Sequence, residues 1–108
     1  MAGRLAAGLV VSALIRRVEA AGGSGMVLAR GDATAGALLI QLADRGVPGA
    51  LLEHMLDARG EYAWAPTGPD DAEARSDYIA RRRRNDPDLW VIELDAKDAA
   101  TIVAEVTG

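Results

Sequence analysis

Residues 89–94, L-W-V-I-E-L, decide the fold. Alternate side chains of a β-strand point to opposite faces. One face of this strand would carry Trp90, Ile92 and Leu94, and the other would carry Leu89, Val91 and Glu93. Because a strand that is apolar on nearly both faces is covered on both, we expect it inside a sheet and not at an edge.

A helix over about 70–84 is predicted just before this strand. Pro69 and the acidic residues that follow it suit a helix start, while Arg81 to Arg84 suit the negative end of the helix dipole. Asn85 is the expected left-handed cap. The helix should also be supported by the i, i+4 pairs Asp71–Arg75 and Asp77–Arg81. Its expected buried stripe consists of Ala74, Tyr78 and the stem of Arg81, with Ile79 beside it.

A second helix should follow the strand. Asp95 is its expected N-cap, with Asp98 at the third helical position in the manner of a capping box. Its apolar stripe would be Ala99, Ile102, Val103 and Val106.

The first half of the chain predicts one more helix and several strands. Apolar residues recur at spacings of three and four between Arg4 and Ala21, which predicts a helix over these residues. Gly22-Gly23 would end that helix. Its stripe would be Ala7, Val10, Val11, Leu14, Val18 and Ala21. A strand through residues 9–11 is the alternative.

Short apolar runs at 26–30, 37–42, 50–56 and 61–66 are separated by turn residues, which is typical of an antiparallel meander. The alternative for the second run is a helix over 33–44, with Asp32 as N-cap.

These elements predict one α+β domain over residues 1–108. We expect a mostly antiparallel sheet of four to five strands with the helices packed on one face, in the order α-β-β-β(-β)-α-β-α. The chain has no cysteine, which excludes disulfides and thiolate metal sites and suits a reducing cytoplasm. The apolar run 5–15 is too short to span a membrane and lacks a signal-peptidase site, so we expect no membrane association. The net charge of −4 makes a nucleic-acid partner unexpected.

Three segments carry a resemblance to a known family: R-R-V-E-A-A-G-G (16–23), V-L-A-R-G-D-A-T-A-G-A-L-L-I (27–40) and R-R-R-N-D-P-D-L-W-V-I-E-L (82–94). Together they resemble a family of small alphaproteobacterial proteins of unknown function, with the pattern R-G-D-x-x-A-G-A followed by D-P-D-L-W-V. The resemblance departs most over 45–80. It implies a soluble cytoplasmic domain, brings no established activity, cofactor or site, and favours strands at 27–30 and 37–42.

Polar residues with potential chemistry mostly have simpler roles. His54 is the only histidine, and it would face away from Glu53 on a strand, so neither a zinc site nor an acid–base pair follows. The loop G-D-A-T-A-G lacks the lysine of a phosphate-binding loop, and Asp32 should close it as a turn. Asp86 and Asp88 are expected to pair with Arg83 or Arg84. No catalytic residue, metal or cofactor is predicted.

The arginine-rich helix is the best candidate for a site. Arg81 and Arg84 would share one side, and Arg75 and Arg82 another, so two guanidinium groups could hold a carboxylate or phosphate. Trp90 or Tyr78 could add stacking for a base. The candidate anion- or partner-binding residues are Arg75, Arg81, Arg82, Arg84 and Trp90. The sequence favours a non-enzymatic protein-interaction or self-associating module, and the alternative is a protein that binds an anion, nucleotide or nucleic acid.

Overall fold

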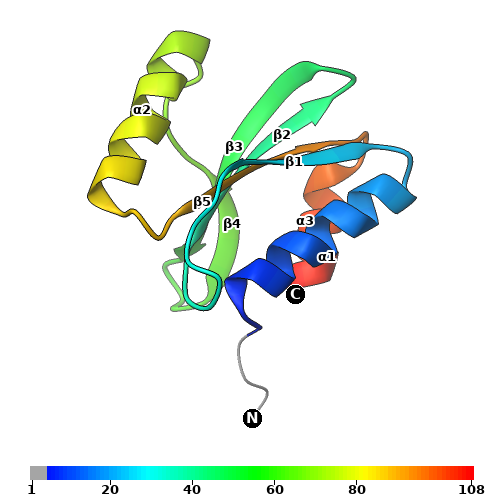
Figure 1. Cartoon of the computed structure of the whole chain (residues 1–108), viewed down its shortest axis with the longest axis horizontal. Helices are drawn as coiled ribbons and strands as arrows, with labels where there is room; N and C mark the ends of the chain where they lie inside the picture. Colours follow the sequence, from blue (N-terminus) through cyan, green and yellow to red (C-terminus); the bar gives the residue numbers. More distant parts are fainter. Residues whose placement is uncertain (1–4) are drawn as a thin grey trace.

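A computed structural model describes residues 5–108 as a mixed five-stranded sheet with three helices (Figure 1). The elements follow the predicted order. They are α1 (Ala7–Ala20), β1 (Ser24–Ala29), β2 (Leu38–Asp44), β3 (Val47–Leu56), β4 (Tyr62–Pro66), α2 (Ala72–Asn85), β5 (Trp90–Asp95) and α3 (Ala99–Thr107). The strand order is β1-β5-β2-β3-β4, and only the β2–β5 pair is parallel. The predicted α+β class and the mostly antiparallel sheet are therefore confirmed.

Strand β5 lies inside the sheet, as its sequence predicted. It pairs antiparallel with β1 and parallel with β2. Trp90, Ile92 and Leu94 are buried in one apolar cluster, while Leu89 and Val91 are buried in a second cluster across the sheet.

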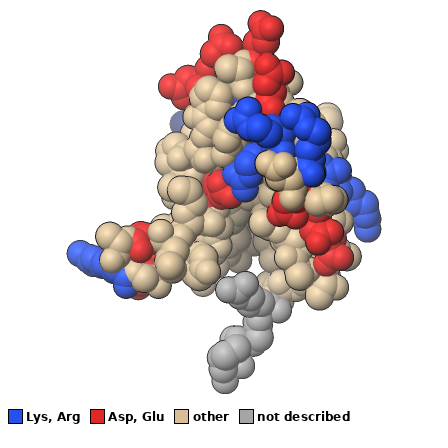
Figure 2. Space-filling view, turned by 90° about the vertical axis from the view of Figure 1, so that its left-hand side faces the viewer, with Lys and Arg blue, Asp and Glu red and all other residues tan. Residues whose placement is uncertain are grey.

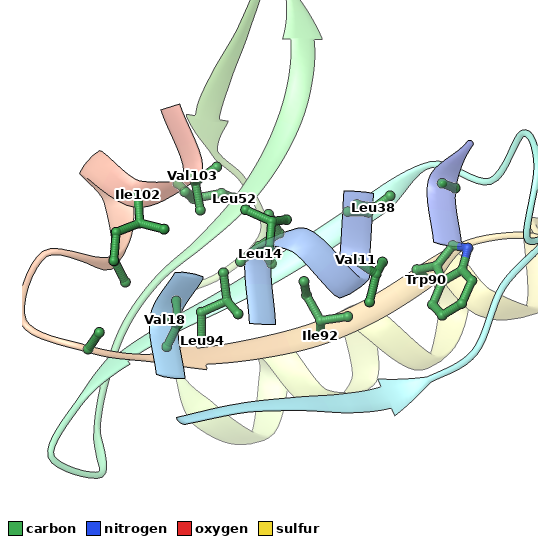
Figure 3. Close-up of a cluster of buried hydrophobic side chains, with 14 residues drawn as sticks. Val11, Leu14, Val18, Leu38, Leu52, Trp90, Ile92, Leu94, Ile102 and Val103 are labelled. Carbon is green, nitrogen blue, oxygen red and sulfur yellow. The ribbon is translucent and has the colours of Figure 1, made fainter. Parts of the chain in front are cut away.

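The larger cluster lies between the sheet and the layer formed by α1 and α3 (Figure 3). Ala7, Val11, Leu14 and Val18 of α1 are buried, which confirms these positions of the predicted apolar stripe. Residues 9–11 are part of this helix, so the strand alternative is wrong. Helix α3 buries Ala99, Ile102 and Val103 on the same face of the sheet, as expected. The predicted first residue of the N-terminal helix, Arg4, lies outside the described residues.

Helix α2 covers the opposite face, which corrects the expectation that all helices share one face (Figure 1). The reason is that the sheet is apolar on both faces, and its second face carries Leu39, Leu51, Leu89 and Val91. Tyr78 and Ile79 of α2 pack against these residues, although no residue of α2 is itself fully buried. The predicted stripe was wrong for Ala74 and Arg81, which are exposed.

The predicted meander is only partly right. Strands β2, β3 and β4 form an antiparallel meander, but β1 pairs with β5 and not with β2. Residues 38–44 form strand β2, so the helix alternative over 33–44 is wrong. The doubly apolar β5 takes the interior position between β1 and β2, because only there are both of its edges and both of its faces covered.

Two predicted caps, at Asn85 and Asp95, need correction, and a further cap at Asp71 was not predicted. Asp71 caps α2, because its Oδ2 accepts a hydrogen bond from the Ala74 amide at 2.9 Å. Asn85 is the last helical residue, and the C-cap is Asp86 with φ −139°, so no left-handed cap forms. Asp95 belongs to β5, and Asp98 is the N-cap of α3, without a capping hydrogen bond from its side chain.

Candidate functional site

Arg75, in the second turn of α2, points toward the sheet and holds α2 in place. Its Nε donates to the carbonyl of Pro69 at 2.9 Å, and its Nη1 donates to Gln41 Oε1 at 3.0 Å and to the carbonyl of Gly49 at 2.7 Å. Its ion pair is with Asp70 at 3.5 Å and not with Asp71, whose carboxylate caps the helix. The guanidinium of Arg75 is thus used within the protein.

Arg82 lies two turns further along the same face and pairs with Glu53 of β3. Its Nη1 and Nη2 donate to the two carboxylate oxygens at 2.9 and 2.5 Å, a bidentate arrangement. The same Nη1 reaches the Tyr78 hydroxyl at 2.9 Å, which in turn lies 2.9 Å from the Thr67 hydroxyl. The Arg82 hydrogen bonds hold the pKa of Glu53 below its usual value, and Glu53 raises the pKa of Arg82.

Arg83 makes contacts that the sequence did not predict. Its Nη1 donates to the carbonyl oxygens of Pro87 and Leu89, both at 2.8 Å, and to that of Arg30 at 3.3 Å. The expected ion pairs of Asp86 or Asp88 with Arg83 or Arg84 do not form in the described part of the chain. Backbone carbonyls carry no residue-type signal, so this partner set could not be found from the sequence.

The other two arginines of the run, Arg81 and Arg84, face outward. Both are exposed, and neither forms an ion pair with any residue between 5 and 108. The expected pair of Asp77 with Arg81 is absent, and Arg81 lies over the Tyr78 ring at 5.8 Å. On the side of the molecule shown in Figure 2, acidic side chains gather at the top, a basic group lies below them, and further acidic side chains lie below that group.

Trp90 is buried and already contacts other parts of the protein, so its ring is not open to a stacking ligand. It is 3% exposed, its Nε1 donates to the carbonyl of Asp32 at 2.7 Å, and the Arg30 guanidinium lies 5.4 Å from its ring. The candidate set of Arg75, Arg81, Arg82, Arg84 and Trp90 is therefore not brought together around one ligand position. Three of its members hold the fold together.

The glycine loop at 31–36 fits closely against the segment that enters β5. A Cβ at Gly31 would overlap the carbonyl oxygen of Asp88 and come within 2.6 Å of Trp90 Cδ1, and Gly36 is similarly close. Asp32 closes the turn as expected, because its Oδ2 accepts from the amides of Thr34 and Ala35 at 3.0 and 2.8 Å. These two hydrogen bonds lower the pKa of Asp32.

The same loop also caps α1. The carbonyl of Ala33 accepts from the Gly8 amide at 2.9 Å, and that of Thr34 accepts from the Ala7 amide at 3.2 Å. The two halves of the R-G-D-x-x-A-G-A and D-P-D-L-W-V pattern are therefore in contact, and their contacts are structural.

His54 takes part in an aromatic row on the β3–β4 hairpin. Its ring centroid lies 4.8 Å from that of Trp64 and 5.2 Å from that of Tyr62. Glu53 faces the other side of the sheet, toward α2, as the strand geometry predicted. Trp64 donates from Nε1 to the Thr107 hydroxyl at 2.8 Å and so joins this hairpin to α3.

Residues 5–108 contain no group of three or more histidine, cysteine, aspartate or glutamate side chains placed to hold a metal ion. Two hollows lie beside α3, with volumes of about 270 and 470 Å³. The larger one is lined mainly by small apolar residues of the β2–β3 hairpin and α3, with Lys97. No helix within 5–108 combines the length and the apolar character needed to cross a membrane.

The outer edge of the sheet at β1 carries an exposed apolar run. Three successive side chains there are exposed and apolar: Met26 (57%), Val27 (41%) and Leu28 (50%). Val27 is opposite Ile92 and so lies on the α1 face, while Met26 is opposite Glu93 and lies on the other face. We call Met26, Val27 and Leu28, with the outer edge of the backbone that carries them, the β1 edge.

The other edge of the sheet, β4, is better protected. It ends at Pro66, which cannot donate a hydrogen bond, and the turn before it carries Asp57, Arg59 and Glu61. Strand β1 contains neither proline nor a charged residue from Ser24 to Ala29, and its one irregularity is the register shift between Val27 and Ala29.

The chain is thus a small α+β domain with a mixed sheet, helices on both faces and an apolar edge strand. It belongs to the family DUF1491, described as a protein of unknown function, whose model matches residues 5–104. A DUF1491 family protein from Caulobacter crescentus CB15, known from a crystal structure, is 34% identical in sequence to this chain. The two structures match with a TM-score of 0.77 over 92% of this chain and 94% of that one.

A second relative gives the same result. The protein Atu0922 from A. tumefaciens, known from a solution structure, is 31% identical in sequence to this chain. The two structures match with a TM-score of 0.75 over 93% of this chain and 92% of that one. Both organisms fit the alphaproteobacterial resemblance seen in the sequence. A search of curated proteins found no match.

Proposed function

We propose that this chain is a non-enzymatic protein-interaction module that binds its partner through the β1 edge. The observation that carries the proposal is a run of three exposed apolar side chains on an edge strand that pairs, within residues 5–108, only with β5. An unpaired edge offers a row of free backbone donors and acceptors, which a partner strand completes. Apolar side chains on both faces of β1 would add burial to those hydrogen bonds.

The polar residues support a binding role more than a catalytic one. The arginines that face the sheet are used in contacts with Glu53, Gln41 and backbone carbonyls. Trp90 and Asp32 stabilise the glycine loop. The absence of cysteine suits a reducing compartment, and we propose that the protein acts in the cytoplasm.

Site-specific photocrosslinking in living cells tests the proposal, because it captures a partner whose identity is unknown. A photoreactive amino acid replaces Leu28 on the β1 edge, and a matched variant carries it at Leu56, which is 59% exposed on the β3–β4 hairpin. We expect a discrete protein adduct from position 28 and none from position 56. The absence of any adduct at 28 from cells that contain folded protein would contradict the proposal.

Anion binding through Arg81 and Arg84 is a second candidate. It is favoured by their exposure and by their lack of ion-pair partners within 5–108. The double variant Arg81→Ala/Arg84→Ala should then lose salt-sensitive binding of inorganic phosphate, a nucleotide or a short RNA, and should keep the melting temperature of the parent chain. If the parent chain binds none of these anions at low salt, this candidate is discarded.

A further inference from the structure

We infer that the partner at the β1 edge is a second copy of this chain, which pairs its own β1 antiparallel across a two-fold axis. This inference rests on the proposed function of the β1 edge and names the occupant. The result is one continuous sheet through two protomers. Such an interface is isologous, because the same strand is used on both sides.

The distribution of exposed apolar residues points to this arrangement. Among the described residues, nine large apolar side chains are exposed, and five of them belong to β1, to the first turn of α1 or to the segment just before it. These five are Leu5, Leu9, Met26, Val27 and Leu28. A two-fold axis perpendicular to the sheet at β1 keeps the α1 helices of both protomers on the same face. One symmetry operation therefore brings Met26, Val27 and Leu28 toward their counterparts.

Helix α1 packs beside β1, so the two groups adjoin. A Cβ on Gly25 of β1 would lie 2.9 Å from the Ile15 side chain, and Gly8 faces Ala33 in the loop after β1. Ile15 and Gly8 therefore mark the side of α1 that faces β1. Leu9 follows Gly8 by about 100° around the helix and lies almost opposite the buried Val11 and Val18, so its side chain points away from the sheet. It is 60% exposed there.

The charges on and around β1 suit pairing with itself. The strand Ser24–Ala29 has no charged residue, so antiparallel self-pairing opposes no like charges, although each chain has a net charge of −4. Arg30 directly follows the strand, and Glu19 lies near its start, beside the turn at Gly22. Antiparallel pairing brings Arg30 of one copy toward the end where the other copy carries Glu19. Two opposite charge pairs would thus flank the apolar centre, as in the polar rim of ordinary interfaces.

The other edge of the sheet limits the assembly to a dimer. Because β1 pairs with β1, each protomer uses its one unprotected edge and leaves β4 outside. Strand β4 ends at Pro66 and follows a charged turn, both of which oppose strand addition. A closed pair is therefore expected, and not a fibre.

Sedimentation equilibrium and disulfide trapping of the whole chain test this inference. The parent chain has no cysteine, so in a single-cysteine variant every disulfide joins two chains. Single cysteines are placed at Ser24, Met26 and Leu28, and at Leu56 as the control. We expect a dimer in solution and rapid oxidation at the β1 position nearest the two-fold axis, where identical residues lie within disulfide range. Oxidation at Leu56 should be at least about tenfold slower.

Charge substitutions complete the test. Leu28→Lys on β1 and the control Leu9→Lys on α1 change exposed side chains, so both variants should keep the circular dichroism spectrum and the melting profile of the monomer. Leu28→Lys should weaken dimerisation by at least about tenfold, because it places two like charges at the interface, whereas Leu9→Lys points away from the sheet and should not. A parent chain that stays monomeric, or a dimer unchanged by Leu28→Lys, overturns the inference.

These outcomes separate the inference from the proposed function. A monomeric chain whose position 28 still yields an adduct with a different protein retains the β1 edge as an interaction site and removes the second copy as its occupant. A monomeric chain without an adduct at 28 removes both.

Discussion

Arg82 of α2 and Glu53 of β3 form a bidentate ion pair across one face of the sheet, with N–O distances of 2.9 and 2.5 Å. Both side chains are mostly covered, with 27% and 20% of their surface exposed. The arrangement explains how a helix without a single fully buried residue stays on the sheet. Charge-assisted hydrogen bonds from Arg75, Arg82 and Arg83 supplement a small apolar contact at Tyr78 and Ile79.

Arg82→Ala should therefore destabilise the protein, because it leaves the half-buried Glu53 carboxylate without its partner. We expect a loss of about 2 kcal/mol in the free energy of unfolding, measured by urea denaturation. Arg84→Ala is the matched control in the same run, and its exposed side chain should change stability by less than about 0.5 kcal/mol. Equal effects of the two substitutions would contradict this role for Arg82.

The same pair should make stability depend on pH in the acidic range. The pKa of Glu53 is lowered in the folded protein relative to its ordinary value of 4.5, so the folded state binds the proton less readily than the unfolded state. The stabilisation is complete above 4.5 and is lost as the pH falls through the folded-state pKa.

Glu53→Gln tests this linkage. The parent chain should be more stable than the variant at neutral pH, and the difference should shrink steadily as the pH falls below 4.5. Denaturation midpoints at several pH values measure it. Asp32, whose pKa is also lowered, remains in the variant and should leave a residual acid dependence. A difference that stays constant with pH would show that Glu53 does not titrate in this way.

Gly31 is predicted to be irreplaceable for a steric reason. A Cβ at this position would overlap the carbonyl oxygen of Asp88, which is backbone and has little freedom to move. Gly31→Ala should cost at least about 2 kcal/mol of stability. Gly49→Ala is the control, because its nearest neighbour would be 3.6 Å away, and it should be nearly neutral. Thermal unfolding of both variants distinguishes steric overlap from a general effect of replacing glycine.

Individual helices and strands could be predicted from the sequence where local residue patterns determine them. The two-faced apolar run at 89–94 correctly predicted an interior strand, and the spacing of Val11, Leu14 and Val18 correctly predicted a helix. The sheet order was not predictable in the same way, because β5 inserts between β1 and β2 from more than 40 residues away in sequence. Because β5 is apolar on both faces, both faces of the sheet need a covering layer, which the expectation of helices on one face does not provide.

The candidate site shows the same division. Helical spacing correctly separated Arg75 and Arg82 from Arg81 and Arg84. The pattern did not show which pair faces the protein, because that depends on Glu53 and Gln41, which lie on other strands. Asp95 was misassigned for a similar reason. Its spacing to Asp98 imitates a capping box, whereas its carboxylate accepts from the amides of Arg45 and Gly46 in a distant turn.

That turn provides the last prediction. Arg45 is the one described non-glycine residue with positive φ, at 53°, and Gly46 follows at 80°. Two successive residues with positive φ between antiparallel strands form the turn type that favours Asn-Gly. A long side chain such as arginine has a steric cost there, whereas asparagine adopts this conformation more readily. The Asp95 hydrogen bonds go to backbone amides and survive a change of the side chain at position 45.

Arg45→Asn should therefore raise the free energy of unfolding by about 0.5 kcal/mol, and Arg45→Val should lower it. Urea denaturation of the two variants measures both signs, and a stabilising valine would contradict the assigned backbone conformation.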